Sequence, residues 1–129
     1  TVRNTPTLNV YRILAANSSW AETTATWNTT NGSTSWAGSA GCSTSGTDFS
    51  STLMAQTLIN ATETAFDFTL SVAEFELMQT ANHGFFFKSS DEGTNADAIF
   101  YVCENGTAAN RPKLVVNYTF RGGFIFNLI

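Results

Sequence analysis

Apolar and aromatic residues occur in short runs, separated by polar stretches rich in Gly, Asn, Ser and Thr. This pattern predicts several short β-strands. The first run lies between residues 7 and 15 and is rich in aromatic and β-branched side chains. Further strands are predicted at residues 25–28, 54–59, 65–68, 85–87, 99–103 and 114–120. In the last of them the apolar residues Leu114, Val116, Tyr118 and Phe120 alternate with Val115, Asn117 and Thr119.

One helix is predicted, from Thr69 to Met78. Ser71 and Glu74 have the spacing of a capping box. Apolar side chains recur on one helical face at positions 72, 75 and 78. Many short strands with one short helix predict an all-β fold, an antiparallel β-sandwich. The length of 129 residues predicts one domain, which we assign to residues 1–120, with residues 121–129 as a separate C-terminal segment.

Charge is scarce in this chain. Charged residues make up 12% of it, about half the usual share. Thr, Ser and Asn together account for 44 of the 129 residues, so hydroxyls and amides would keep the surface soluble. The net charge of −4 disfavours nucleic acid and anionic membranes as partners, because both require a basic face. No apolar run approaches the roughly 20 residues of a membrane span.

Six glycosylation sequons indicate an exported, extracellular protein. They begin at Asn17, Asn28, Asn31, Asn60, Asn105 and Asn117. The chain starts at Thr1 without a leader pattern, so either a leader has been removed or the chain is part of a longer product. Cys42 and Cys103 match no metal-binding spacing, and we expect them to form a disulfide; the alternative is two buried thiols.

The sequence offers no catalytic constellation, and we expect no enzyme activity, metal or cofactor. The single histidine, His83, precedes Gly84 in a predicted turn and has no nucleophile nearby in sequence. Asp91, Asn95 and Asp97 could supply oxygen ligands to Ca²⁺, but their spacing matches no EF-hand, and a solvated acidic loop is the favoured interpretation.

The three tryptophans have two interpretations. Exposed rings could stack on sugars, because their faces are flat and rigid. The favoured alternative is that Trp20 and Trp27 close the core, whereas Trp36 holds the long polar loop in place.

Several segments together resemble DNRLRE-type domains. They are Asn9-Val10-Tyr11-Arg12, Ser19-Trp20-Ala21-Glu22, Ala25-Thr26-Trp27-Asn28, Ser35-Trp36-Ala37-Gly38, Phe66-Asp67-Phe68-Thr69-Leu70-Ser71-Val72, Asn82-His83-Gly84-Phe85 and Arg111-Pro112-Lys113-Leu114-Val115-Val116-Asn117-Tyr118. The resemblance runs from about residue 7 to residue 120. It implies a secreted, jelly-roll-like β-sandwich of surface proteins, some of which bind polysaccharide, and it carries no catalytic residues onto this chain.

Two departures from that family motivate a specific hypothesis. The opening strands of the family would lie before residue 1, and this chain adds residues 121–129 at its end. A sandwich lacking strands exposes an unpaired edge. The added segment has Gly122 and Gly123 as a hinge, followed by an uncharged apolar run that we take as the assembly strand: Phe124, Ile125, Phe126, Leu128 and Ile129.

We therefore expect a structural subunit of an extracellular filament. The strand of one subunit would complete the sheet of the next, in a head-to-tail assembly of identical subunits. The alternative is a carbohydrate-binding module for an extracellular polysaccharide, using Trp20, Trp27 or Trp36 as a stacking platform.

Overall fold

The structure is a computed structural model that describes residues 2–3, 6–60, 65–93, 97–98, 100 and 103–117. The chain divides into two compact units, Thr1–Ile99 and Phe100–Ile129, and each is described by itself. Both termini and the predicted assembly strand lie outside the described residues. The predicted boundary at residue 120 lies there as well.

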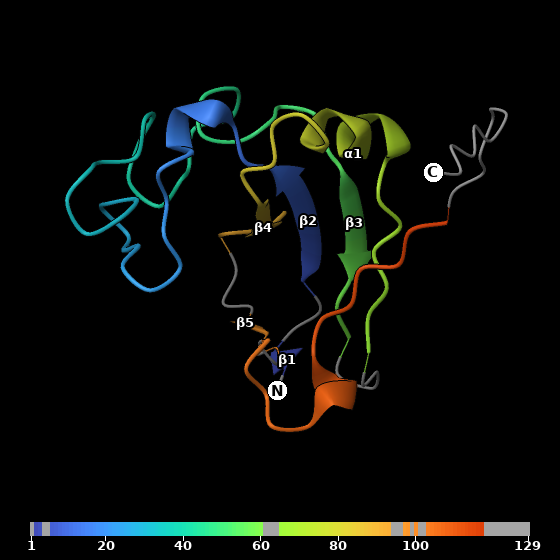
Figure 1. Cartoon of the computed structure of the whole chain (residues 1–129). Helices are drawn as coiled ribbons and strands as arrows, with labels where there is room; N and C mark the ends of the chain where they lie inside the picture. The colour runs from blue at the N-terminus through green and yellow to red at the C-terminus, as the bar shows by residue number, and fades with distance from the viewer. Residues whose placement is uncertain are drawn as a thin grey trace, which may run out of the picture. The chain divides into compact units, whose positions relative to one another are not determined.

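A three-stranded antiparallel sheet is the centre of the first unit (Figure 1). Its middle strand is β2 (Thr7–Arg12), with β3 (Ala55–Leu58) on one side and β4 (Phe85–Ser89) on the other. Val10 of β2 pairs with Ala55 on one side and with Phe87 on the other. A separate antiparallel pair joins β1 (Val2–Arg3) to β5 (Asp97–Ala98). The runs predicted at 54–59 and 85–87 are therefore confirmed as strands, and the run predicted at 7–15 is confirmed from residue 7 to residue 12. The run predicted at 99–103 lies largely outside the described residues.

The two faces of the sheet carry different side chains, because neighbouring residues in a strand point to opposite faces. One face carries the fully buried Val10. The opposite face carries an aromatic cluster in which the ring of Phe49 lies 4.8 Å from Tyr11 and 5.0 Å from Phe86, between ring centroids. Backbone pairing of Ile13 with Phe49 holds this cluster at the end of β2.

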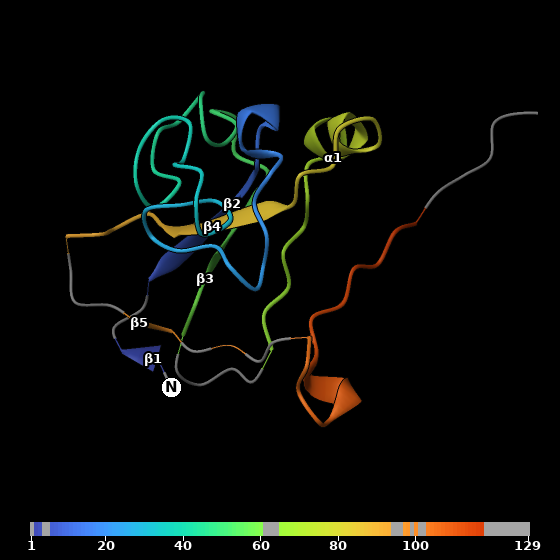
Figure 2. The ribbon, with the colours of Figure 1, turned by 60° about the vertical axis from the view of Figure 1, so that its left-hand side comes forward.

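Helix α1 (Val72–Met78) lies at the end of the sheet where β2 ends and β4 begins (Figures 1 and 2). Ser71 caps it by accepting a hydrogen bond from the backbone N–H of Glu74. The Glu74 side chain does not complete the predicted capping box: it accepts a hydrogen bond at 3.2 Å from Arg12 of β2 instead. Glu74 and Met78 are buried, whereas Val72, expected on the apolar face, is largely exposed.

The predicted all-β, jelly-roll-like sandwich is wrong. The described residues form a small mixed structure, with the three-stranded sheet, α1 and two 3₁₀ helices, η1 (Ala15–Asn17) and η2 (Ala108–Asn110). Residues 25–28 form no strand, and residues 65–68 and 114–117 pair with no described strand. β-propensity alone does not make a strand, because the backbone groups of a strand need a partner edge.

Side-chain hydrogen bonds, together with isolated bridges and turns, order the long polar segment between η1 and β3, which contains no extended strand. Thr26 Oγ1 accepts from the backbone N–H groups of Asn28 and Thr29, and Asn31 Oδ1 accepts from those of Ser33 and Thr34. Such local bonds compete with a sheet ladder for the same backbone groups. They explain why the predicted strand at 25–28 does not form.

The described part of the second unit contains η2 and the segment that follows it. Arg111 closes η2, with its backbone N–H bonded to the carbonyl of Ala108 and its Nε donating to the Asn105 carbonyl at 2.8 Å. Residues 112–117 form no helix or strand. No helix among the residues that the structure describes has the length and apolar character needed to cross a membrane.

Candidate functional site

Three consecutive apolar side chains of the second unit are exposed. Leu114, Val115 and Val116 keep 58%, 76% and 51% of their surface accessible. They lie in an extended segment that follows η2 (Figure 2). Because a contiguous apolar run exposed to water is uncommon in a monomeric protein, this segment is a candidate contact surface.

In the first unit, the outer edge of β4 is a matching candidate. The Gly84 carbonyl accepts from the backbone N–H of Ile13, directly after β2, and the Ser90 N–H donates to Thr7 of β2. By alternation, the backbone groups of Phe85, Phe87 and Ser89 point away from β2. No described strand pairs with that side of β4. The side chain of Phe87 is 52% exposed, and its ring meets Phe68 edge-on with the centroids 5.8 Å apart.

The edge formed by β3, unlike that of β4, is bonded to another segment of the first unit at one end. The backbone N–H of Ser71 bonds to the carbonyl of Met54 at 2.8 Å, which ties the segment leading into α1 to the start of β3. In both views this segment returns alongside β3 (Figures 1 and 2). Leu58, at the other end of β3, is exposed.

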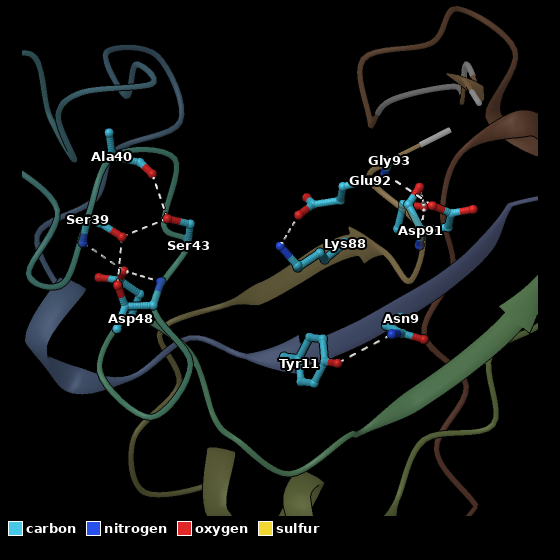
Figure 3. A network of polar contacts seen from close by, with 12 residues as sticks. Asn9, Tyr11, Ser39, Ala40, Ser43, Asp48, Lys88, Asp91, Glu92 and Gly93 are labelled. Carbon is cyan, nitrogen blue, oxygen red and sulfur yellow. Dashed lines mark hydrogen bonds and ion pairs between the residues drawn. The ribbon is translucent and has the colours of Figure 1, made fainter. Parts of the chain in front are cut away.

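The polar loop that carries the tryptophans is built around Asp48 (Figure 3). This carboxylate is fully buried and accepts four hydrogen bonds, at 2.8–3.2 Å: from the Asn17 side chain and from the backbone N–H groups of Gly38, Ser39 and Thr44. Burial alone would raise the pKa of the Asp48 carboxyl, but these hydrogen bonds outweigh it and hold the pKa below its ordinary value. Asp48 was not predicted; a lone Asp among small polar residues was its only signal.

Trp27 is the exposed tryptophan of this loop. It keeps 70% of its surface accessible, so the expectation that it closes the core is wrong. Its ring lies against the backbone of Gly41, whose φ of 74° and missing Cβ allow this close approach.

The other two tryptophans are half-buried and hydrogen-bonded. Trp20 donates its indole N–H to the carbonyl of His83 and packs against Gly84 at the start of β4. Trp36 donates to the carbonyl of Thr26 at 3.0 Å, as expected of a side chain that holds the loop in place. Of the three predicted stacking residues, Trp27 therefore has the exposure that a sugar would need.

The predicted glycosylation sites differ in accessibility. Asn17 is fully buried, and its amide nitrogen donates to the Asp48 carboxylate, so the folded chain leaves no room for a glycan there. Asn28 and Asn117 are exposed. The remaining three sequon residues are half-buried: Asn31, Asn60 and Asn105.

Cys42 and Cys103 are both thiols in this structure, so the predicted disulfide is not formed here. Cys42 is buried, and this burial, with a smaller contribution from Asp48, raises its pKa to about 12. A thiol with such a pKa forms little thiolate and therefore exchanges slowly. Cys103 is exposed and donates to the Glu104 carboxylate at 2.8 Å, which lowers the pKa of Glu104.

The acidic loop after β4 forms internal contacts. Glu92 pairs with Lys88 of β4, and Asp91 Oδ1 accepts from the backbone N–H of Gly93 (Figure 3). Asn95, one of the three residues considered for calcium, is not among the described residues, so the solvated loop stays a prediction. Residues 94–96 lie outside the described part of the chain.

No family model, curated protein or solved structure matches this chain. The resemblance to DNRLRE-type domains therefore stays a prediction.

Proposed function

We propose that this chain is a non-enzymatic structural subunit of an extracellular assembly, in which copies join by β-strand addition. The exposure of Leu114, Val115 and Val116 is the observation that carries this proposal. Burying a Val or Leu side chain contributes roughly 1.5–3 kcal/mol, so a segment of three can stabilise a contact between copies.

The described segment is followed directly by residues 118–129, which are rich in apolar and aromatic side chains and include one charge, Arg121. The predicted assembly strand, residues 124–129, is part of this stretch, with residues 122 and 123 as its hinge. We propose that the described segment and the predicted strand both contribute to the contact. Separate variants distinguish their contributions.

Sedimentation velocity over a concentration series tests the proposal. The unaltered chain should form larger species as its concentration rises. Val115→Lys should shift the chain toward monomers, because a charge at this position has to be desolvated in the contact. Ser51→Lys adds the same charge at an exposed polar position of the first unit and should leave assembly unchanged.

Deleting residues 121–129 measures the contribution of the C-terminal strand. Loss of assembly in this variant alone would assign the contact to residues 121–129. A chain that stays monomeric at every concentration without any substitution would contradict the proposed function.

The exposed Trp27 favours a second candidate, a carbohydrate-binding module. Its ring is held on the backbone of Gly41, in a loop lined by Thr, Ser and Asn side chains that can bond to sugar hydroxyls. Trp27→Ala should then abolish retention on an insoluble polysaccharide such as cellulose or chitin. Leu53→Ala, which removes another exposed apolar side chain, is the matched control. Equal retention of both variants would contradict this candidate.

A further inference from the structure

We infer that the outer edge of β4 accepts residues 113–117 of a second copy of this chain as an added strand. This inference rests on the proposed function, and it names the surface and the partner. The acceptor is a sheet edge of the first unit and the donor is a segment of the second unit, so the contact joins two different surfaces. Such a heterologous contact produces open chains of subunits unless the rotation closes a ring.

The acceptor edge offers backbone groups at a regular spacing. The groups of Phe85, Phe87 and Ser89 that point away from β2 can pair with an incoming strand, as in other sheet-edge additions. The half-exposed ring of Phe87 lies on the same face of the sheet as Val10. An added strand would place every second side chain beside this ring and cover it.

The donor segment has the properties of an added strand. Residues 114–116 are apolar, mostly β-branched and exposed, and none of them pairs with a described strand. Proline precedes them at position 112 and none of residues 113–117 is a proline, so each of these five residues carries a backbone N–H that can join a ladder. The segment carries one charge, Lys113, at its start.

Contacts elsewhere in the first unit favour the β4 edge over the β3 edge as the acceptor of an added strand. The start of β3 is already bonded to Ser71, and the segment leading into α1 returns beside it. Charged residues on an edge strand guard against uncontrolled pairing. On β4 the charge is Lys88, whose ammonium is already paired with Glu92 and whose side chain lies on the face opposite to Phe87.

Disulfide trapping between two differently tagged chains tests the inference. All chains carry Cys103→Ser, whereas the buried Cys42 is kept because it reacts slowly. The acceptor chain carries Phe87→Cys, and three donor chains carry Leu114→Cys, Val115→Cys or Val116→Cys. Ser89→Cys is a second acceptor on the same edge, in case the loss of the Phe87 ring weakens the fold. Gln56→Cys, exposed on β3, is the matched control at the other edge.

Strand pairing predicts a yield of linked heterodimer that alternates along the donor. Position 115 should differ from positions 114 and 116 by about threefold or more, because neighbouring side chains point to opposite faces. The two β4 acceptors should link better than Gln56→Cys. Equal yields at the three donor positions, or preferential linking to Gln56→Cys, would overturn the inference.

The same samples separate this inference from the proposed function. Sedimentation of the Cys103→Ser chain without added cysteines reports assembly alone. Assembly without alternating linkage to β4 would support the proposed function and contradict the assignment of β4 as the acceptor edge. Alternating linkage in a chain that never assembles beyond pairs supports the contact and overturns the filament.

Discussion

The carboxylate of Asp48 holds the polar loop between Asn17 and Thr44 in place by accepting several hydrogen bonds. It binds one side chain and three backbone N–H groups while being fully buried. A carboxylate can accept this many bonds at once because both of its oxygens carry free lone pairs. The loop therefore depends on the charge of this residue as well as on its size.

We expect Asp48→Asn to lower the free energy of unfolding by about 2–4 kcal/mol, because the amide nitrogen replaces an acceptor with a donor and leaves N–H groups unsatisfied. Urea unfolding followed by tryptophan fluorescence measures this change. Asp67→Asn, at an exposed carboxylate, is the control and should change stability by less than about 0.5 kcal/mol. Equal effects of the two variants would contradict the role of Asp48.

The lowered pKa of Asp48 also predicts a pH dependence. A carboxyl whose pKa is lower in the folded than in the unfolded chain stabilises the fold above its unfolded pKa of about 3.9, and this stabilisation is lost as the pH falls through the folded pKa. The difference in stability between the unaltered chain and Asp48→Asn should therefore be constant from pH 7 to pH 5 and shrink below about pH 4. A difference that stays unchanged from pH 7 down to pH 3 would contradict the lowered pKa, because the loss has to begin below the unfolded pKa.

The two cysteines should differ in reactivity. Iodoacetamide at pH 8 should label the exposed Cys103 in the folded chain and label Cys42 only after unfolding, because burial raises the pKa of Cys42 to about 12. Mass spectrometry identifies the labelled peptide. If neither cysteine reacts in the unfolded chain until a reductant is added, the two form a disulfide in solution.

At the scale of elements, alanine substitutions at Gly41 and Gly46 distinguish the cost of backbone strain from the cost of losing the contact with Trp27. Both glycines have positive φ, but a Cβ on Gly41 would overlap the Trp27 ring, whereas a Cβ on Gly46 would meet open space. Alanine at either position costs about 1 kcal/mol for the left-handed backbone. Gly41→Ala should cost more and shift the tryptophan emission, which Gly46→Ala should leave unchanged. Matching thermal unfolding curves and spectra for the two variants would contradict the contact.

The attachment of α1 to the sheet depends on the Arg12–Glu74 pair. Both side chains are largely buried, so Glu74→Ala leaves the Arg12 charge without its partner and should cost about 3 kcal/mol. Glu92→Ala breaks the more exposed Lys88–Glu92 pair and should cost less than about 1 kcal/mol. Chemical denaturation of the two variants compares them directly. Similar costs would show that burial does not set the strength of these pairs.

The elements that could be predicted from sequence are those with long-range partners for their apolar residues. The residues of β2, β3 and β4 form apolar runs bounded by turns, and Ser71 marks the start of α1. The runs at 25–28 and 114–117 have similar β-propensity but no partner strand among the described residues. Pairing depends on the three-dimensional neighbourhood, which local propensity does not contain.

The candidate site was predicted only in part. A spare apolar strand was expected at residues 124–129, which lie outside the described residues, whereas residues 114–116 were expected to be paired inside a sandwich. Their exposure follows from the absence of that sandwich. The exposure of Trp27 could not be predicted from the local sequence either, because the glycine under its ring lies 14 positions further along the chain.

At the scale of the whole molecule, one chain carries both a β4 edge that no described strand pairs and an exposed apolar segment, residues 114–116. Low charge favours a contact between the two, because few ionised groups have to be desolvated when copies meet. An exposed edge and an exposed apolar segment in one chain are a liability unless they are used, since both promote uncontrolled pairing. Regular strand addition between copies would occupy both.

Amide hydrogen exchange of the full chain at low and high concentration tests this claim most directly, because a backbone N–H that joins a ladder exchanges more slowly. We predict that protection rises with concentration in residues 113–117 and at Phe87, whose N–H points away from β2. Tyr11, in the middle of the sheet, should be protected equally at both concentrations. Assembly with no added protection in these two segments would contradict strand addition as the way in which the copies join.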